Sequence, residues 1–163
     1  ALSTPMILLA LGLLAGTNRT KLFTALTMDI GMCITGLAAA LTTSSYLLRW
    51  AWYLVSCAFF AAVLYVLLVE WPEDAAAAGT DAIFGTLKTL TVVLWFGYPI
   101  FWALGAEGFA VLGVSTTSWA YSLLDIGAKY AFAFLLLRWV AANQPTIGRL
   151  STSNTGPAAA VDD

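Results

Sequence analysis

The chain has 163 residues, of which 61% are hydrophobic and only 10% are charged, and its formal net charge at pH 7 is −2. Soluble domains carry about a quarter charged residues, so this composition argues against a soluble single-core domain and indicates a membrane protein. Nucleic acid is not an expected partner, because phosphate recognition needs clustered Lys and Arg. The chain has no His, and Cys33 and Cys57 lie in separate apolar segments. We therefore expect no metal site, no disulfide and no His-based enzyme chemistry.

Five apolar segments follow one another along the chain, and the last four are typical of helices that cross a lipid bilayer. We place them at about residues 1–15, 22–43, 46–70, 82–105 and 116–142. The first is too short to cross alone, because about 15 helical residues rise about 22 Å, whereas the hydrocarbon core is about 30 Å thick. The chain also opens with neither Met nor a flanking charge. We therefore expect a fragment that begins within a helix.

The connection after the third segment is expected to be flexible. The sequence Glu70-Trp71-Pro72-Glu73-Asp74 is predicted to close that segment. The alanines at 75–78 and Gly79 follow, and we expect them to form a flexible connector that is too polar at its edges to be a membrane span.

The basic residues predict the orientation in the membrane. They gather near one set of segment ends: Arg19, Lys21, Lys88, Arg138 and Arg149. Only Arg49 marks the opposite set, so the first set is expected to face the cytoplasm of a multi-pass protein of the cell membrane. Residues 145–163 are rich in Ser, Thr, Gly, Pro and Ala, and are predicted to form a disordered cytoplasmic tail.

Two ionisable residues in the last segment, Asp125 and Lys129, suggest a functional site. They are four residues apart, so they share one face of a helix at membrane depth, where charges are costly. One interpretation is a structural ion pair that neutralises itself. The other is chemical: a Lys in apolar surroundings loses its proton more readily and can form a Schiff base with a carbonyl, with Asp125 as counterion of the resulting cation.

The fourth segment carries an aromatic pattern, Trp95-Phe-Gly-Tyr98-Pro99-Ile-Phe-Trp102. Trp95 and Trp102 are two turns apart and share a face with Tyr98 and Pro99. Pro99 is expected to bend the helix and to free a backbone acceptor. Such a stripe is often plain packing; beside a bend, two Trp planes could instead sandwich a long, flat, conjugated ligand.

Taken together, four motifs resemble the microbial rhodopsins of haloarchaea: Leu124-Asp125-Ile-Gly-Ala-Lys129, Trp95-x-x-Tyr98-Pro99-x-x-Trp102, Gly105-x-Glu107-Gly108 and Thr4-Pro5. The resemblance extends from Ala1 to about Gln144 and places the start of the chain in the third of seven helices. It implies an all-α membrane protein with five transmembrane helices, the first one partial, of a seven-helix bundle that binds retinal as a Schiff base. It also implies a homo-oligomer, a trimer in this family.

By this resemblance, Lys129 would carry all-trans retinal and Asp125 would be one counterion. Asp29 would lie near the ring end of the retinal, and we expect it to be protonated because an unpaired carboxylate is costly among apolar neighbours. The residues implied to form the pocket with Lys129 are Thr4, Ile7, Asp29, Met32, Gly36, Tyr53, Ser56, Cys57, Phe60, Trp95, Tyr98, Pro99 and Trp102.

The resemblance favours a light-driven inward chloride pump over a proton pump. Proton pumps of the family keep a cytoplasmic carboxylate that reprotonates the Schiff base, and Ala10 stands at that position here. They also keep two glutamates near the outer surface; Glu107 matches one, whereas Thr117 replaces the other. A vectorial proton path needs titratable groups on both sides of the Schiff base.

The stretch from Ala1 to Ala10 resembles that of the chloride-pumping members of the family. Ser3 would then coordinate chloride beside the protonated Schiff base, near Asp125, and the halide would supply charge compensation. The family's main counterion position and the Arg of its anion site precede Ala1, so this interpretation rests on Ala10, Thr117 and overall similarity. The alternatives are a sensory photoreceptor, which also lacks the cytoplasmic donor, then a proton pump, and finally a non-photoactive membrane protein with a structural Asp–Lys pair.

Overall fold

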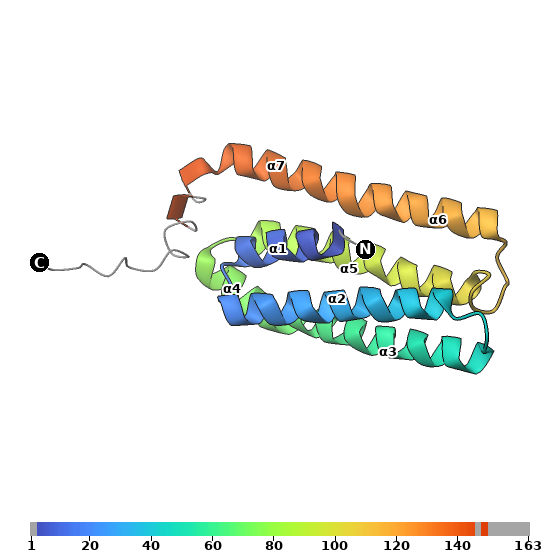
Figure 1. Ribbon diagram of the computed structural model, residues 1–163. Coiled ribbons are helices and arrows are strands. Elements are labelled where there is room, and N and C mark those ends of the chain that lie inside the picture. The colour runs from blue at the N-terminus through green and yellow to red at the C-terminus, as the bar shows by residue number, and fades with distance from the viewer. Residues whose placement is uncertain (1–2, 146–147, 150–163) are drawn as a thin grey trace, which may run out of the picture.

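The computed structural model describes residues 3–145 and 148–149, and in this part of the chain all regular structure is helical. The helices lie side by side along one axis (Figure 1), and α1 contacts α2, α4 and α5. Two of the rods each contain a π-helical turn, η1 or η2. The elements are α1 Ser3–Ala15, α2 Arg19–Leu41, α3 Tyr46–Tyr65, η1 Val66–Glu70, α4 Trp71–Ala78, α5 Asp81–Leu104, α6 Val114–Ile126, η2 Gly127–Ala131 and α7 Phe132–Ala142.

Within the described residues, four helical rods are long and apolar enough to cross a bilayer: Arg19–Leu41, Tyr46–Ala78, Asp81–Leu104 and Val114–Ala142. The shortest has 23 residues, and a helix of that length rises about 35 Å, more than the hydrocarbon thickness. α1 is apolar but has only 13 residues. The predicted all-α, multi-pass membrane fold is confirmed.

The start of α2 differs from the sequence-based boundary because a side chain caps it. The predicted segment begins at residue 22, whereas the helix begins at Arg19. The Asn18 side chain accepts a hydrogen bond of 2.8 Å from the backbone N–H of Lys21. This contact satisfies one of the N–H groups that a helix start leaves without a partner.

The prediction of a flexible connector at residues 75–78 is wrong. The helical rod that begins with α3 continues through η1, which ends at Glu70, into α4, and it ends only at Ala78. Pro72 follows directly after the π-helical turn η1, where the backbone N–H of Trp71 bonds the carbonyl of Val66 five residues earlier and the regular α-helical bonding of the rod is already interrupted. The helix ends where Gly79 adopts a left-handed conformation with φ of 73°, which glycine enters without steric cost.

Side chains from α4 and the following turn fasten this corner to the end of α1 and the start of α2. Asp74 accepts a hydrogen bond of 2.8 Å from the Thr17 hydroxyl and pairs with Lys21 at 3.1 Å. The buried Thr80 hydroxyl donates to the backbone carbonyl of Leu14 at 2.7 Å, which satisfies one of the free carbonyls at the end of α1. α4 is therefore held by tertiary contacts and is not a free linker.

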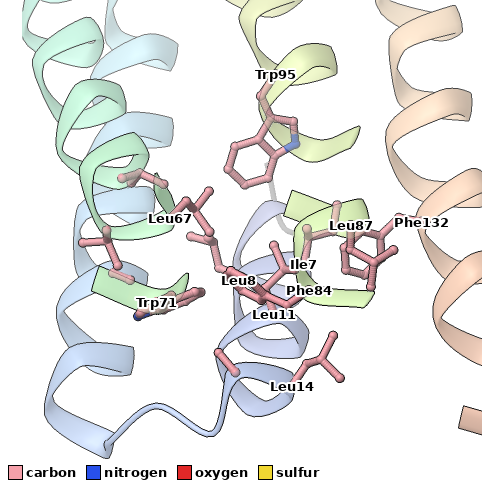
Figure 2. Packing of buried hydrophobic residues seen from close by; sticks show 14 of the residues in the cluster. Ile7, Leu8, Leu11, Leu14, Leu67, Trp71, Phe84, Leu87, Trp95 and Phe132 are labelled. Carbon is pink, nitrogen blue, oxygen red and sulfur yellow. The ribbon is translucent and has the colours of Figure 1, made fainter. Parts of the chain in front are cut away.

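The buried apolar core lies where α1 ends and α5 begins (Figure 2). The close approach of α1 and α4 depends on Gly12, because a Cβ at this position would lie 3.1 Å from the indole of Trp71 and 2.5 Å from Leu22. The largest side chains of this apolar core that are almost completely buried are Leu8, Leu11, Leu67, Trp71, Phe84 and Leu87.

The predicted disordered tail, residues 145–163, lies for the most part outside the described residues. Where the described chain ends, α7 has reached the same end of the bundle as α4 and the C-terminal end of α1 (Figure 1). Arg138 of α7, Lys21 of α2 and Lys88 of α5 therefore lie in the half of the bundle that contains the apolar core.

Candidate functional site

A cavity of about 310 Å³ lies among α1, α2, α3, α5, α6 and η2. Its volume falls within the range of about 300–1,000 Å³ that is typical of small-molecule sites. Its lining is mostly apolar and aromatic, with a few polar groups. The residues that line it are Ser3, Thr4, Met32, Cys33, Gly36, Tyr53, Ser56, Cys57, Phe60, Trp95, Tyr98, Pro99, Trp102, Tyr121, Asp125 and Lys129.

Charge in the cavity is confined to one connected group. The ammonium of Lys129 lies 2.7 Å from Oδ2 of Asp125, and the Tyr98 hydroxyl donates a hydrogen bond to Oδ1 of the same carboxylate. Among the described residues that line the cavity, Asp125 is the only carboxylate and Lys129 is the only cation. Both oxygens of Asp125 are thus engaged, and the carboxylate is fixed in orientation toward Lys129.

The backbone at Lys129 is π-helical. α6 ends at Ile126, and η2 carries Lys129 before the helix resumes as α7. π-turns are rare and occur often at functional sites. The ion pair between Lys129 and Asp125, four residues apart, is also what a purely structural pair would show. Because both residues line a cavity, the chemical interpretation is favoured.

Flat aromatic side chains form the walls next to these charges. Trp95, Tyr98, Pro99 and Trp102 all line the cavity, as expected for one face of α5. The ring of Trp102 stacks on that of Tyr53, with centroids 4.4 Å apart and an interplanar angle of 12°. The Tyr53 hydroxyl donates to the carbonyl of Pro99 at 3.0 Å, so that its polar end is satisfied while its ring remains a wall.

Small and hydroxyl residues close the side formed by α2 and α3. Ser56 donates to the carbonyl of Met32 at 2.9 Å, which ties α3 to α2. A Cβ at Gly36 would lie 3.2 Å from the Ser56 hydroxyl oxygen, so a larger residue there would press against the Ser56 side chain. The arrangement leaves a mostly apolar space with a primary amine at one wall, and an apolar aldehyde such as retinal can condense with that amine.

Two residues of the predicted pocket do not line the cavity. Ile7 belongs to the buried core and is 7% exposed. Asp29 is fully buried, and its Oδ2 accepts a hydrogen bond of 3.0 Å from the hydroxyl of Thr4, which does line the cavity. Asp29 therefore lies behind the wall, one side chain away from the space itself.

Two cavity residues were not predicted, Cys33 and Tyr121. Cys33 lies three residues before Gly36, and Tyr121 lies four residues before Asp125. Both spacings place the missed residue on the same helical face as a predicted one. The signal was present in the sequence, but the same spacing is equally common on faces that pack without a ligand.

The structure also defines the surroundings of Glu107 and Thr117, which, by the family resemblance, distinguish a chloride pump from a proton pump. Thr117 is buried at the start of α6 and donates to the carbonyl of Gly113 at 3.0 Å. Oε2 of Glu107 is buried and makes no hydrogen bond within the described residues. Arg49 donates to the backbone carbonyl of Glu107 at 3.0 Å, not to its side chain. The hydroxyl of Thr91, on α5 between the apolar core and the cavity, is likewise buried without a partner in the described part of the chain.

Comparison with known proteins agrees with this geometry. The chain is 73% identical over 159 residues to halorhodopsin of Halorubrum sodomense, covering 98% of the chain and 56% of that relative. It is also 73% identical over 162 residues to cruxhalorhodopsin-3 of Haloarcula vallismortis, covering 99% of the chain and 59% of that relative. The chain thus spans between 56% and 59% of the length of these curated relatives.

A solved structure described as "Halorhodopsin, a light-driven chloride pump" superposes with a TM-score of 0.88 at 62% sequence identity, over 90% of this chain and 62% of that one. Residues 1–143 match the family described as bacteriorhodopsin-like protein. The helical fold, the Lys129 site and these similarities lead to one conclusion: the chain belongs to the bacteriorhodopsin-like protein family.

Proposed function

We propose that this chain acts in light-driven inward chloride transport, with all-trans retinal bound to Lys129 as a protonated Schiff base. The observation that carries the proposal is the pairing of Lys129 with a single carboxylate, Asp125, in an aromatic cavity that Ser3 also lines. Sequence identities of 70% to 73% to several halorhodopsins, and a solved neighbour described as "Halorhodopsin, a light-driven chloride pump", support chloride as the ion. The protein is in this view an ion transporter and not an enzyme.

When bound, retinal supplies the absorption of visible light and the isomerisation from all-trans to 13-cis that redirects the N–H of its linkage to Lys129. Asp125 compensates the positive charge at this N–H, and the hydroxyl of Tyr98 holds the carboxylate in place. The hydrogen bond from Tyr98 occupies one oxygen of the Asp125 carboxylate. A halide at the Ser3 hydroxyl can therefore supply further negative charge beside the cation on Lys129. Trp95 and Trp102 keep the bound group in a single flat slot.

The inward path follows from the same geometry. Ala10 stands where proton pumps of the family keep a carboxylate, and the hydroxyl of Thr91 borders the route from the cavity toward the apolar core. A buried hydroxyl with a free O–H can donate to a passing anion. The apolar core next to this route favours transient over tight binding, and conduction requires an ion to leave as well as to enter.

The orientation follows the distribution of basic residues. Lys21, Lys88 and Arg138 lie toward the end of the bundle where α7 finishes, whereas Arg49 lies at the other end. The positive-inside rule then places the C-terminal end of α7 in the cytoplasm. We also propose a homotrimer in the cell membrane, by analogy with the family.

A transport assay tests the proposal. The chain is completed with the portion of the Halorubrum sodomense relative that it does not cover, and is expressed in cells suspended in unbuffered NaCl with retinal. Inward chloride movement makes the cell interior negative, so light should raise the external pH, and a protonophore should increase that rise. Sulfate in place of chloride, and the Lys129→Arg variant, should each abolish the response.

The other outcomes separate the alternatives. A light-induced fall in external pH that a protonophore abolishes would indicate an outward proton pump and contradict the proposal. A coloured protein that moves no ions would also contradict it, and would favour the sensory photoreceptor.

A further inference from the structure

Tyr121 of α6 is a cavity residue whose role neither the sequence motifs nor the proposed pump explains. Its ring lies parallel to that of Tyr98, with centroids 5.9 Å apart and an interplanar angle of 16°. No hydrogen bond joins its hydroxyl to another of the described residues. Tyr121 therefore contacts Tyr98 through its aromatic ring and not through its hydroxyl.

Tyr98, on which Tyr121 stacks, also donates its hydroxyl hydrogen bond to the carboxylate of Asp125. Tyr121 and Asp125 are one helical turn apart on α6 and face the same residue of α5. Asp125 accepts the hydroxyl hydrogen bond of Tyr98, and Tyr121 packs on the ring of Tyr98. α6 thus holds Tyr98 at two points, and a swing of its ring would break the hydrogen bond to the carboxylate.

We propose that Tyr121 is a positioning residue for the counterion. Its ring restrains Tyr98, Tyr98 orients Asp125, and Asp125 is thereby held at the ion-pair distance from Lys129. This inference rests on the proposed function, because it assigns Tyr121 to the charge compensation of a Schiff base at Lys129. Tyr121 acts only through Tyr98 and does not itself contact the reacting atoms.

Packing at the same junction supports a fixed relation between the two helices. Gly97 precedes Tyr98, and a Cβ at Gly97 would lie 2.7 Å from a methyl carbon of Leu124. Leu124 precedes Asp125 in the same way. α5 and α6 therefore meet closely where the Tyr98–Asp125 bond forms, so small movements of Tyr98 are not absorbed by slack between the helices.

The test uses the completed chain with all-trans retinal and follows the visible absorption band. Tyr121→Leu and Tyr121→Met remove the ring, Tyr121→Phe keeps it, and Tyr65→Leu is the control, since Tyr65 is 57% exposed and lies on α3. If Asp125 is held less firmly, it stabilises the positive charge on the Schiff-base nitrogen less well in the ground state, and the energy gap for light absorption becomes smaller. The Leu and Met variants should therefore absorb at longer wavelength, whereas the Phe variant and the control should keep the parental band.

A double-mutant cycle separates positioning from a general loss of packing. Tyr98→Phe removes the hydrogen bond to Asp125 and should shift the band by itself. If Tyr121 acts through Tyr98, adding Tyr121→Leu to Tyr98→Phe should move the band no further. A merely structural role would lower the Tm of the Leu variant and leave its band in place.

Several results would overturn the inference. They are an unchanged band in both the Leu and Met variants, a shift in the Phe variant as large as in the Leu variant, an equal shift in the Tyr65→Leu control, and additive shifts in the double mutant. Absence of any visible band in the parent protein would differ from all of these, because it would contradict the proposed function and the inference together.

Discussion

At the scale of single residues, the account depends on the primary amine of Lys129. Arg at this position would keep a positive charge beside Asp125, but a guanidinium does not condense with an aldehyde. We expect Lys129→Arg to abolish the visible band of the completed, retinal-treated protein without preventing its insertion. Lys88→Arg, which changes the same functional group elsewhere in the bundle, should keep the band. A visible band of normal intensity in Lys129→Arg would remove retinal from this site.

The second prediction at this scale concerns Ser3. A hydrogen bond to a charged group contributes about 1.5–3 kcal/mol, which corresponds to a factor of about ten or more in a dissociation constant. Ser3→Ala should raise the chloride concentration that gives half of the spectral shift by about that factor. Ser122→Ala is the control, because Ser122 is exposed and its hydroxyl donates to the backbone of Ser118. Equal halide affinity in Ser3→Ala and the parent would exclude Ser3 from the anion site.

The sequence predicts the charged centre of the site better than its periphery. The four-residue spacing of Asp125 and Lys129 predicts one helical face without any tertiary information. The same spacing links Tyr121 to Asp125, but a Tyr on an apolar helix carries no free-energy cost that suggests a function, whereas a charge at membrane depth does. The stack of Tyr121 on Tyr98 depends on how α6 approaches α5, which no local pattern defines.

At the scale of helices, close approaches at glycine are the sensitive points. A Cβ at Gly105, the cap of α5, would lie 2.8 Å from the backbone carbonyl of Phe101 and 3.0 Å from Thr117. A backbone atom cannot move aside as a side-chain tip can. We expect Gly105→Ala to destabilise the protein by about 1–3 kcal/mol through overpacking, measured as a lower Tm of the pigment.

Gly85 supplies the matched control on the same helix. A Cβ there would have no neighbour within 4 Å, and Ala is a better helix former than Gly by about 1 kcal/mol. Gly85→Ala should therefore leave the Tm unchanged or raise it. Equal losses in the two variants would show that the junction at Gly105 has no special role.

Helix α4 illustrates what local patterns could not predict. Its composition, with Pro72 and a run of alanines before Gly79, is typical of a connector. The contacts that order it come from residues far away in the sequence: Thr17 is 57 and Lys21 is 53 positions from Asp74. The start of α2 at Arg19, by contrast, depends on the Asn18 cap, a local signal that the sequence contains.

At the scale of the whole molecule, the bundle is divided along its length. The aromatic cavity, with Lys129 and Asp125, lies in one half, and most of the apolar core lies in the other; Phe60 and Trp95 belong to both. Thr91 is a buried hydroxyl on the helix that passes from one half to the other. In the proposed transport, an anion that leaves the site beside Lys129 would pass the apolar core before it reaches the basic residues at this end of the bundle.

A visible absorption titration tests this account most directly. The completed chain is reconstituted with all-trans retinal in a sulfate buffer free of halide, and chloride is added stepwise. The account predicts a visible band that moves to a new position with a saturable dependence on chloride, because the anion then lies beside the charge on Lys129. A visible band that stays in place through molar chloride would contradict an anion site at Lys129.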